Sequence, residues 1–278
     1  MGEKNIKDNR DGQSSFQRAW EVLFPYLLYY LVFNGAYIIL AFAYQAGMEY
    51  FGEGYRQFMT VHALTVSSVA EGLCRVTGVW PLVPVLKKEL QMRASARGKR
   101  IVREKVIILT QTVVFAVSVS LGLNVLLTLT GFAESSAAYR EVADYQYGVS
   151  FGLGLILYGV VSPLAEEVVF RGIIYNRLRR FFGPLFGIVV SALFFGIFHG
   201  NLVQGVYGTI MGIFMAYVYE RQDSFLGPVL FHTVANLAVY TVAHLRRMQT
   251  ALLTPWGCVI LLAVAIVCVF FEEKGRKR

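Results

Sequence analysis

The chain contains eight long stretches of mostly apolar residues, and these stretches restrict its possible folds more than any other feature. A helix of about 20 apolar residues is long enough to cross the hydrocarbon core of a bilayer. Only helices and closed barrels can span lipid, and most of the stretches lack the alternation that is typical of barrel strands. We therefore expect an all-α, polytopic membrane protein. The stretches occur at about residues 24–47, 58–86, 106–130, 147–170, 185–200, 202–219, 226–244 and 252–271.

The count of transmembrane helices depends mainly on the second stretch, which Glu71, Arg75 and Pro81 interrupt. We predict eight spans, with seven as the alternative. Composition agrees with a membrane protein, because 56% of the 278 residues are hydrophobic and only 16% are charged. A soluble domain is closer to half apolar and a quarter charged.

Lys and Arg residues are distributed unevenly between the apolar stretches. If the N-terminus is cytosolic, 21 of the 26 basic residues lie on the cytosolic side, four lie outside and Arg75 lies within a span. This distribution follows the positive-inside rule. We therefore expect residues 1–18 to form a cytosolic tail, residues 19–278 to form one transmembrane domain, and both termini to be cytosolic. The net charge of +8 then indicates anchoring on anionic lipid of the bilayer rather than binding to nucleic acid.

Three ionisable residues lie at the end of the fourth apolar stretch, in the sequence Pro-Leu-Ala-Glu-Glu-Val-Val-Phe-Arg over residues 163–171. A charged group at the centre of a bilayer costs roughly 2.5–3.5 kcal/mol on insertion scales, so these residues need an explanation. Glu167 and Arg171 have the spacing at which a helical carboxylate meets a guanidinium. Glu166 lies about 100° around the helix and remains available. The alternative interpretation is a buried polar lock between helices, without catalysis.

Two further patterns place histidines on separate apolar stretches. Phe195 and His199 are one helical turn apart, and so are His232 and Asn236. A carboxylate, two imidazoles and an amide around one cavity can activate water and stabilise a tetrahedral intermediate. Taken separately, each pattern also fits an interhelical hydrogen bond, which is worth about 0.6 kcal/mol in membranes.

These three patterns, Glu-Glu-x-x-x-Arg, Phe-x-x-x-His and His-x-x-x-Asn in this order, resemble the CPBP family. That family comprises the CAAX prenyl proteases and bacteriocin-processing enzymes, also known as the Abi family. The resemblance covers about residues 147–244, where we expect the catalytic core. It implies an intramembrane endopeptidase that acts on a membrane-associated protein or peptide, and we expect it in a bacterial cell membrane.

The resemblance also implies a role for each motif residue. Glu166 and His199 would activate water, and His232 and Asn236 would stabilise the oxyanion. Glu167 and Arg171 would form a supporting ion pair. The family has been described both as metalloproteases and as metal-free glutamate proteases, and in the first case the ligands would come from Glu166, His199 and His232.

The residues themselves favour no cofactor, with zinc as the alternative. The sequence has no His-Glu-x-x-His motif, so the geometry of soluble zinc proteases is unsupported. An amide such as that of Asn236 is a good oxyanion donor and a poor zinc ligand.

Two functions from other classes remain open at this point. A proton-coupled transporter could use Glu166 and His199 as a relay, but it predicts inverted repeats that the sequence does not show. A non-catalytic scaffold or immunity protein would not need the intact set of motifs. The substrate also stays open between CAAX-type proteins, leader or signalling peptides, and other membrane proteins.

One question of depth follows from helix geometry. Glu166 and His199 each lie about 16 residues from Gly183, whereas His232 lies only about six residues, or roughly 9 Å, into its span. A bent or interfacial segment over residues 171–182 would bring the three to one depth.

Overall fold

The computed structural model describes residues 14–95 and 102–275, and every regular element in these ranges is helical. The prediction of an all-α, polytopic membrane protein is confirmed. Within the described ranges, six helical stretches are long and apolar enough to cross a membrane, and a bent pair raises the number to seven. They are Ser15–Tyr50, Ala63–Ala94, Ile107–Leu129, Phe151–Phe182, Leu202–Gln222 and Leu226–His244, with Arg246–Leu252 and Pro255–Phe270 as the bent pair.

The count of eight is not confirmed, and helix α11 (Pro184–Phe198) is the reason. It has 15 residues, or about 22 Å of helix, which is shorter than a hydrocarbon core of about 30 Å. Gly183 and Gly200 bound it, with φ angles of 90° and 71° that an L side chain rarely adopts. The chain therefore turns at both ends of α11 before the helix reaches spanning length.

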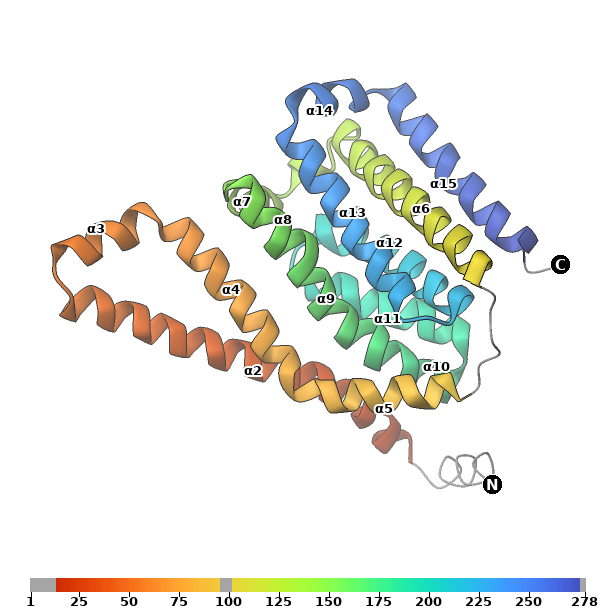
Figure 1. Ribbon diagram of the computed structural model, residues 1–278, viewed down its shortest axis with the longest axis horizontal. Coiled ribbons are helices and arrows are strands. Elements are labelled where there is room, and N and C mark those ends of the chain that lie inside the picture. The colour runs from red at the N-terminus through yellow and green to blue at the C-terminus, as the bar shows by residue number, and fades with distance from the viewer. Residues whose placement is uncertain (1–13, 96–101, 276–278) are drawn as a thin grey trace.

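The bundle is built around a few close helix pairs. α11 packs along α12 (Leu202–Gln222), and α6 (Val102–Leu129) packs between α13 (Leu226–His244) and α15 (Pro255–Gly275). Figure 1 shows α2 (Ser15–Tyr50) and α4 (Ala63–Val79) as a hairpin that projects from this bundle, joined at its far end by α3 (Glu53–Val61). A capping box between Ser14 and Gln17 begins α2.

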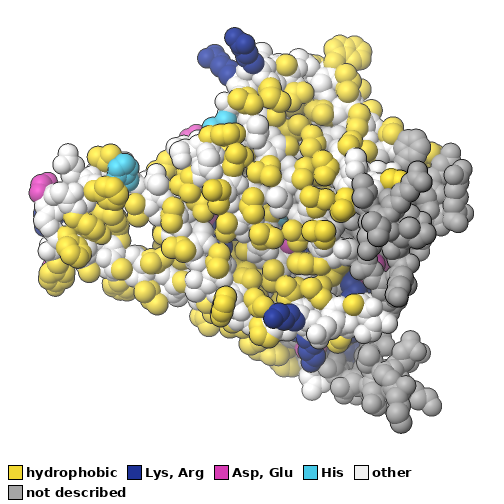
Figure 2. All heavy atoms as spheres, viewed as in Figure 1, with side chains coloured by type: hydrophobic (Ala, Val, Ile, Leu, Met, Phe, Trp, Pro, Cys, Tyr) yellow, Lys and Arg dark blue, Asp and Glu magenta, His cyan; other side chains and the backbone are white. Residues whose placement is uncertain are grey.

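The remaining helices lie at the two ends of the bundle or carry the site. α5 (Val83–Ala94) follows α4 after a short 3₁₀ turn at Trp80–Leu82, and α7 (Ala137–Tyr147) lies near the opposite end (Figure 1). Figure 2 shows hydrophobic side chains over most of one face and few charged ones, as expected of a surface in contact with lipid. The stretch Phe151–Phe182 contains, in order, α8 (Phe151–Ile156), a π-helical turn (Leu157–Val161), α9 (Ser162–Glu167), a second π-helical turn (Val168–Tyr175) and α10 (Asn176–Phe182).

The packing of α10 against α12 bears on the question of depth. The stretch Phe151–Phe182 is one continuous helical span. The end of α12 lies level with the start of α10 rather than with the turn at Gly183, because the hydroxyl of Tyr175 donates to Glu220 near the end of α12, at 2.5 Å. α10 therefore extends past the α12–α13 turn, and a residue early in α13 reaches the middle of the preceding span.

The charge distribution gives a prediction about orientation. A topology reporter inserted after Ser95 should be cytosolic, because the surrounding connection carries eight Lys and Arg residues from 87 to 105. A reporter after Ala138 should be external, because Arg140 is the one basic residue in the connection that contains α7. Paired alkaline phosphatase and fluorescent-protein fusions measure both positions. An external signal at Ser95 would contradict the predicted orientation.

Candidate active site

The paired carboxylates lie on α9, a short α-helical segment between the two π-helical turns. Glu166 is 6% exposed and Glu167 is fully buried. π-Helical turns inside an α-helix change the direction of neighbouring side chains and are frequent at functional sites. Here the two adjacent carboxylates contact different partners.

Glu167 lies at the centre of a buried ion pair. Its Oε1 atom is 3.0 Å from Nη1 of Arg171, as the spacing of the two residues predicts. The same oxygen is 2.9 Å from Nδ1 of His232. Arg171 is fully buried, donates from Nη2 to the carbonyl of Gly212 and lies 4.4 Å from the centre of the Phe195 ring. The span Phe151–Phe182 therefore meets α11, α12 and α13 at this one cluster.

Glu166 has a different environment, because its two oxygens face different groups. Oε1 accepts a hydrogen bond from Nη1 of Arg75 at 2.9 Å. Oε2 is 3.7 Å from Nε2 of His232, which is too far for a direct hydrogen bond. One oxygen is thus fixed by a cation, and the other has room for a water molecule beside it.

Arg75 and Glu71 are site residues whose role the sequence did not reveal. Both were recognised only as interruptions of an apolar stretch. Arg75 also donates to Glu71 through Nη2 at 2.7 Å, so one guanidinium bridges Glu71 on α4 and Glu166 on α9. The signal was present: a carboxylate and a guanidinium one turn apart in an apolar span, the same spacing as in Glu167 and Arg171.

His199 follows the last residue of α11 and its orientation is fixed. Nδ1 lies 2.8 Å from the carbonyl oxygen of Phe195. Because a carbonyl only accepts, Nδ1 carries the hydrogen and Nε2 is left as an acceptor in the neutral ring. The Phe195 ring packs edge-on against His199 at 4.9 Å and against His232 at 5.5 Å, so it lies against both imidazoles.

Asn236 is one turn after His232 on α13. Its amide nitrogen donates to the carbonyl of Tyr158 at 3.0 Å, which fixes the amide group. Tyr158 lies in the first π-helical turn, and its hydroxyl donates to Ser68 on α4.

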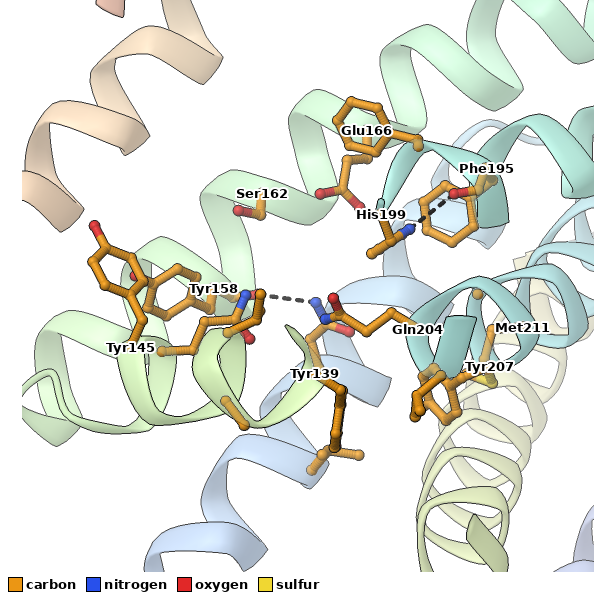
Figure 3. Close-up of a pocket in the computed structure, with 18 of the residues that line it drawn as sticks. Tyr139, Tyr145, Tyr158, Ser162, Glu166, Phe195, His199, Gln204, Tyr207 and Met211 are labelled. Atoms are coloured by element: carbon orange, nitrogen blue, oxygen red, sulfur yellow. Dashed lines mark hydrogen bonds between the residues drawn. The ribbon is translucent and has the colours of Figure 1, made fainter. Parts of the chain in front are cut away.

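A cavity of about 820 Å³ connects these residues. Glu166, His199, His232 and Asn236 all line it, together with Glu71 and Arg75. In Figure 3 the side chains of Glu166 and His199 face the same space, with Ser162 and Tyr158 along one wall and Gln204 and Tyr207 along another. The structure thus brings together all four residues to which the resemblance assigns a catalytic role.

Glu166, His199 and His232 are the candidate ligands for a metal ion. Within residues 14–95 and 102–275, no group of three or more His, Cys, Asp and Glu side chains is arranged to hold one. One of the three candidate ligands already has a cationic partner, because the Arg75 guanidinium holds Glu166. A fixed cation on the carboxylate opposes a second cation there. This donor set does not fit zinc as it stands.

The fold and the site define a polytopic membrane protein with a polar, ionisable cavity enclosed by its helices. Residues 148–238 match the family model described as type II CAAX prenyl endopeptidase Rce1-like. This segment contains all three motifs. Over this segment the chain is similar to the CAAX prenyl endopeptidases of that family, which confirms the resemblance found from the motifs.

Two curated relatives agree with the family. Over 139 residues the chain is 27% identical to "Putative membrane peptidase YdiL" of Bacillus subtilis (strain 168), covering 43% of this chain and 57% of that protein. Over 97 residues it is 29% identical to "CAAX prenyl protease 2" of Homo sapiens, covering 28% of this chain and 30% of that protein. The chain thus spans about half and about a third of the lengths of these relatives. No solved structure matches at a significant level.

Proposed function

We propose that the protein is an intramembrane endopeptidase that hydrolyses a peptide bond of a membrane-associated protein or peptide. The observation that carries this proposal is the position of Glu166. One of its oxygens is fixed by Arg75, while the other faces a cavity shared with His199, His232 and Asn236. The match of residues 148–238 to a family model of endopeptidases supports the same reaction.

The first step would be attack by water on the substrate carbonyl. Glu166 takes a proton from the water as its oxygen forms a bond to the carbonyl carbon. His199 can orient the same water, because its Nε2 is an acceptor once Nδ1 donates to Phe195. Collapse of the tetrahedral intermediate breaks the C–N bond, and the proton on Glu166 passes to the leaving amine.

The oxyanion of the intermediate needs donors on the other side of the cavity. Nδ1 of His232 already faces Glu167, so its Nε2 donates to the oxyanion only when the ring is an imidazolium. The carboxylate of Glu167 and the oxyanion itself would balance that charge, because Glu166 holds the proton from the water at this stage. The remaining N–H of the Asn236 amide is a second donor, because its first N–H is bonded to Tyr158. Preorganised donors of this kind stabilise developing charge without reorganisation.

Asn236→Leu should test the oxyanion role in a cleavage assay with purified protein in liposomes. Leucine is about the same size as asparagine but has no N–H donor, so we expect kcat to fall about 10²–10³-fold. The fold should be retained, since only one hydrogen bond to the Tyr158 carbonyl is lost. Mass spectrometry of the peptide products and a melting curve measure the two effects. Unchanged kcat would remove Asn236 from the proposed mechanism.

The same assay separates the metal-free version from the zinc alternative. Exhaustive chelation should leave the wild-type rate unchanged, and elemental analysis of active enzyme should find less than stoichiometric zinc. A zinc ion that is lost together with activity and restores activity on return would defeat the metal-free version.

A further inference from the structure

The cavity runs from the site toward one end of the bundle, as the lining residues on successive helices show. On α12 they extend from Met215 back to Val203, near the start of that helix. On α13 they extend from His232 forward to Tyr240. α4 contributes Ser67, Glu71 and Arg75. All three series lead away from Glu166 in the same direction, toward the end of the bundle that carries α3 and α7.

That end of the cavity is lined by polar and aromatic side chains. α7 and the residues before it supply Ala133, Tyr139, Glu141 and Tyr145, and the end of α6 supplies Asn124 and Thr128. Gln204 and Tyr207 stand on the opposite wall in Figure 3. The hydroxyl and amide groups on these walls can form hydrogen bonds with the backbone of an extended peptide.

The opposite end of the bundle is closed by ion pairs among α5, α10 and α12. Glu89 on α5 is 3% exposed and pairs with Arg177 at 2.8 Å and with Arg180 at 2.6 Å. Arg93, also on α5, pairs with Glu220 and Asp223 around the end of α12. None of these residues lines the cavity. This closed end is also the one that carries most of the Lys and Arg residues.

We propose that the polypeptide substrate and the reacting water enter from the end that carries α3 and α7, on the extracytoplasmic side of the membrane. The side follows from the cytosolic orientation of the basic end. The substrate class is then a membrane-associated polypeptide whose cleavage site is presented from outside the cell. This inference rests on the proposed function and adds the side of access to it.

Thiol labelling tests the side of access. Cys74, Cys258 and Cys268 are replaced by alanine, and single cysteines are introduced by Ser162→Cys and Val239→Cys, both of which line the cavity. Glu53→Cys on α3 and Ser95→Cys after α5 are matched controls, because both positions are exposed at opposite ends of the bundle. The probe is a membrane-impermeant, negatively charged methanethiosulfonate, applied to intact cells and to inverted membrane vesicles.

We expect Ser162→Cys, Val239→Cys and Glu53→Cys to react in intact cells, and only Ser95→Cys to react in inverted vesicles. Ser162 is one turn before Glu166, so the reagent on Ser162→Cys should also block cleavage completely. Reaction of the cavity cysteines from inverted vesicles would overturn the proposal. So would failure to react from either side before denaturation, or reaction of Ser95→Cys in intact cells.

The labelling pattern does not depend on turnover. If the wild-type protein cleaves no peptide, the proposed function fails while the pattern still reports which end of the cavity is open. If the protein is active and the cavity cysteines react from the cytosolic side, only the side of access is wrong.

Discussion

Glu166→Gln should abolish peptide-bond cleavage, with a loss of at least about 10²–10⁴ in kcat, while the protein accumulates at a near-normal level. The amide cannot take a proton from water, and general-base catalysis contributes a factor of this size. The fold should tolerate the change, because Glu71 still neutralises Arg75 through its own ion pair at 2.7 Å. Cleavage products measured by mass spectrometry and immunoblots of membranes give the two quantities.

Glu71→Gln is the matched control. It removes one carboxylate from the same guanidinium but leaves the contact between Arg75 and Glu166. We therefore expect it to retain most of the activity. Wild-type turnover in Glu166→Gln would show that this carboxylate is not the base, and equal losses in both variants would mean that the network acts only through its charge balance.

Arg171→Ala should cause the largest loss of stability of any single charge removal in the site, about 3–5 kcal/mol. Arg171 and Glu167 are both fully buried, so the substitution leaves a carboxylate without its cation in the interior. Glu167→Gln should also destabilise, since Arg171 and His232 both lose the charge that they face. Thermal unfolding in detergent, followed by tryptophan fluorescence, measures the shift in Tm.

Arg179→Ala provides the comparison for that result. Arg179 also pairs with a carboxylate, Glu220 at 2.7 Å, but its side chain is 41% exposed and Glu220 keeps a second partner in Arg93. An exposed pair contributes about 0–1 kcal/mol. If Arg171→Ala melted as close to the wild type as Arg179→Ala does, the buried pair would not be a stabilising element.

The parts of the site that could be predicted from the sequence are those set by local helical spacing. The contact between Glu167 and Arg171 follows from four residues of separation, and the π-helical turns around α9 did not disturb it. The contact between His232 and Glu167 joins residues 65 positions apart. It depends on how far α12 runs before turning, which no local pattern determines.

Charge in an apolar span carried more information than the sequence interpretation took from it. Glu71 and Arg75 lowered the predicted strength of the second span, yet they are there because a carboxylate on another helix requires a cation. The other site residues were identified because they belong to one of the three motifs. Glu71 and Arg75 have the same four-residue spacing, but they belong to none of these motifs. The bounds of α11 agree closely with the predicted apolar stretch at residues 185–200, but a helix of 15 residues is too short to count as a span.

The 3₁₀ turn at Trp80–Leu82 has a mechanical consequence. Pro81 is a natural kink point between α4 and α5, and α5 is fixed by Glu89 and Arg93. A tilt of α4 about this turn would therefore move α4 as a lever. Arg75 lies about 8 Å from the pivot and Leu64, at the far end, about 24 Å.

Displacements along such a lever scale with distance from the pivot. A movement of about 6 Å at Leu64 moves Arg75 by about 2 Å, which is enough to separate its guanidinium from Glu166, 2.9 Å away at rest. One motion would then have two effects. It would widen the outer end of the cavity for a bulky chain, and it would free Oε1 of Glu166 from Arg75. The Glu166 carboxylate would then stay bound to Arg75 while the cavity is narrow, and it would be released when a substrate widens the cavity.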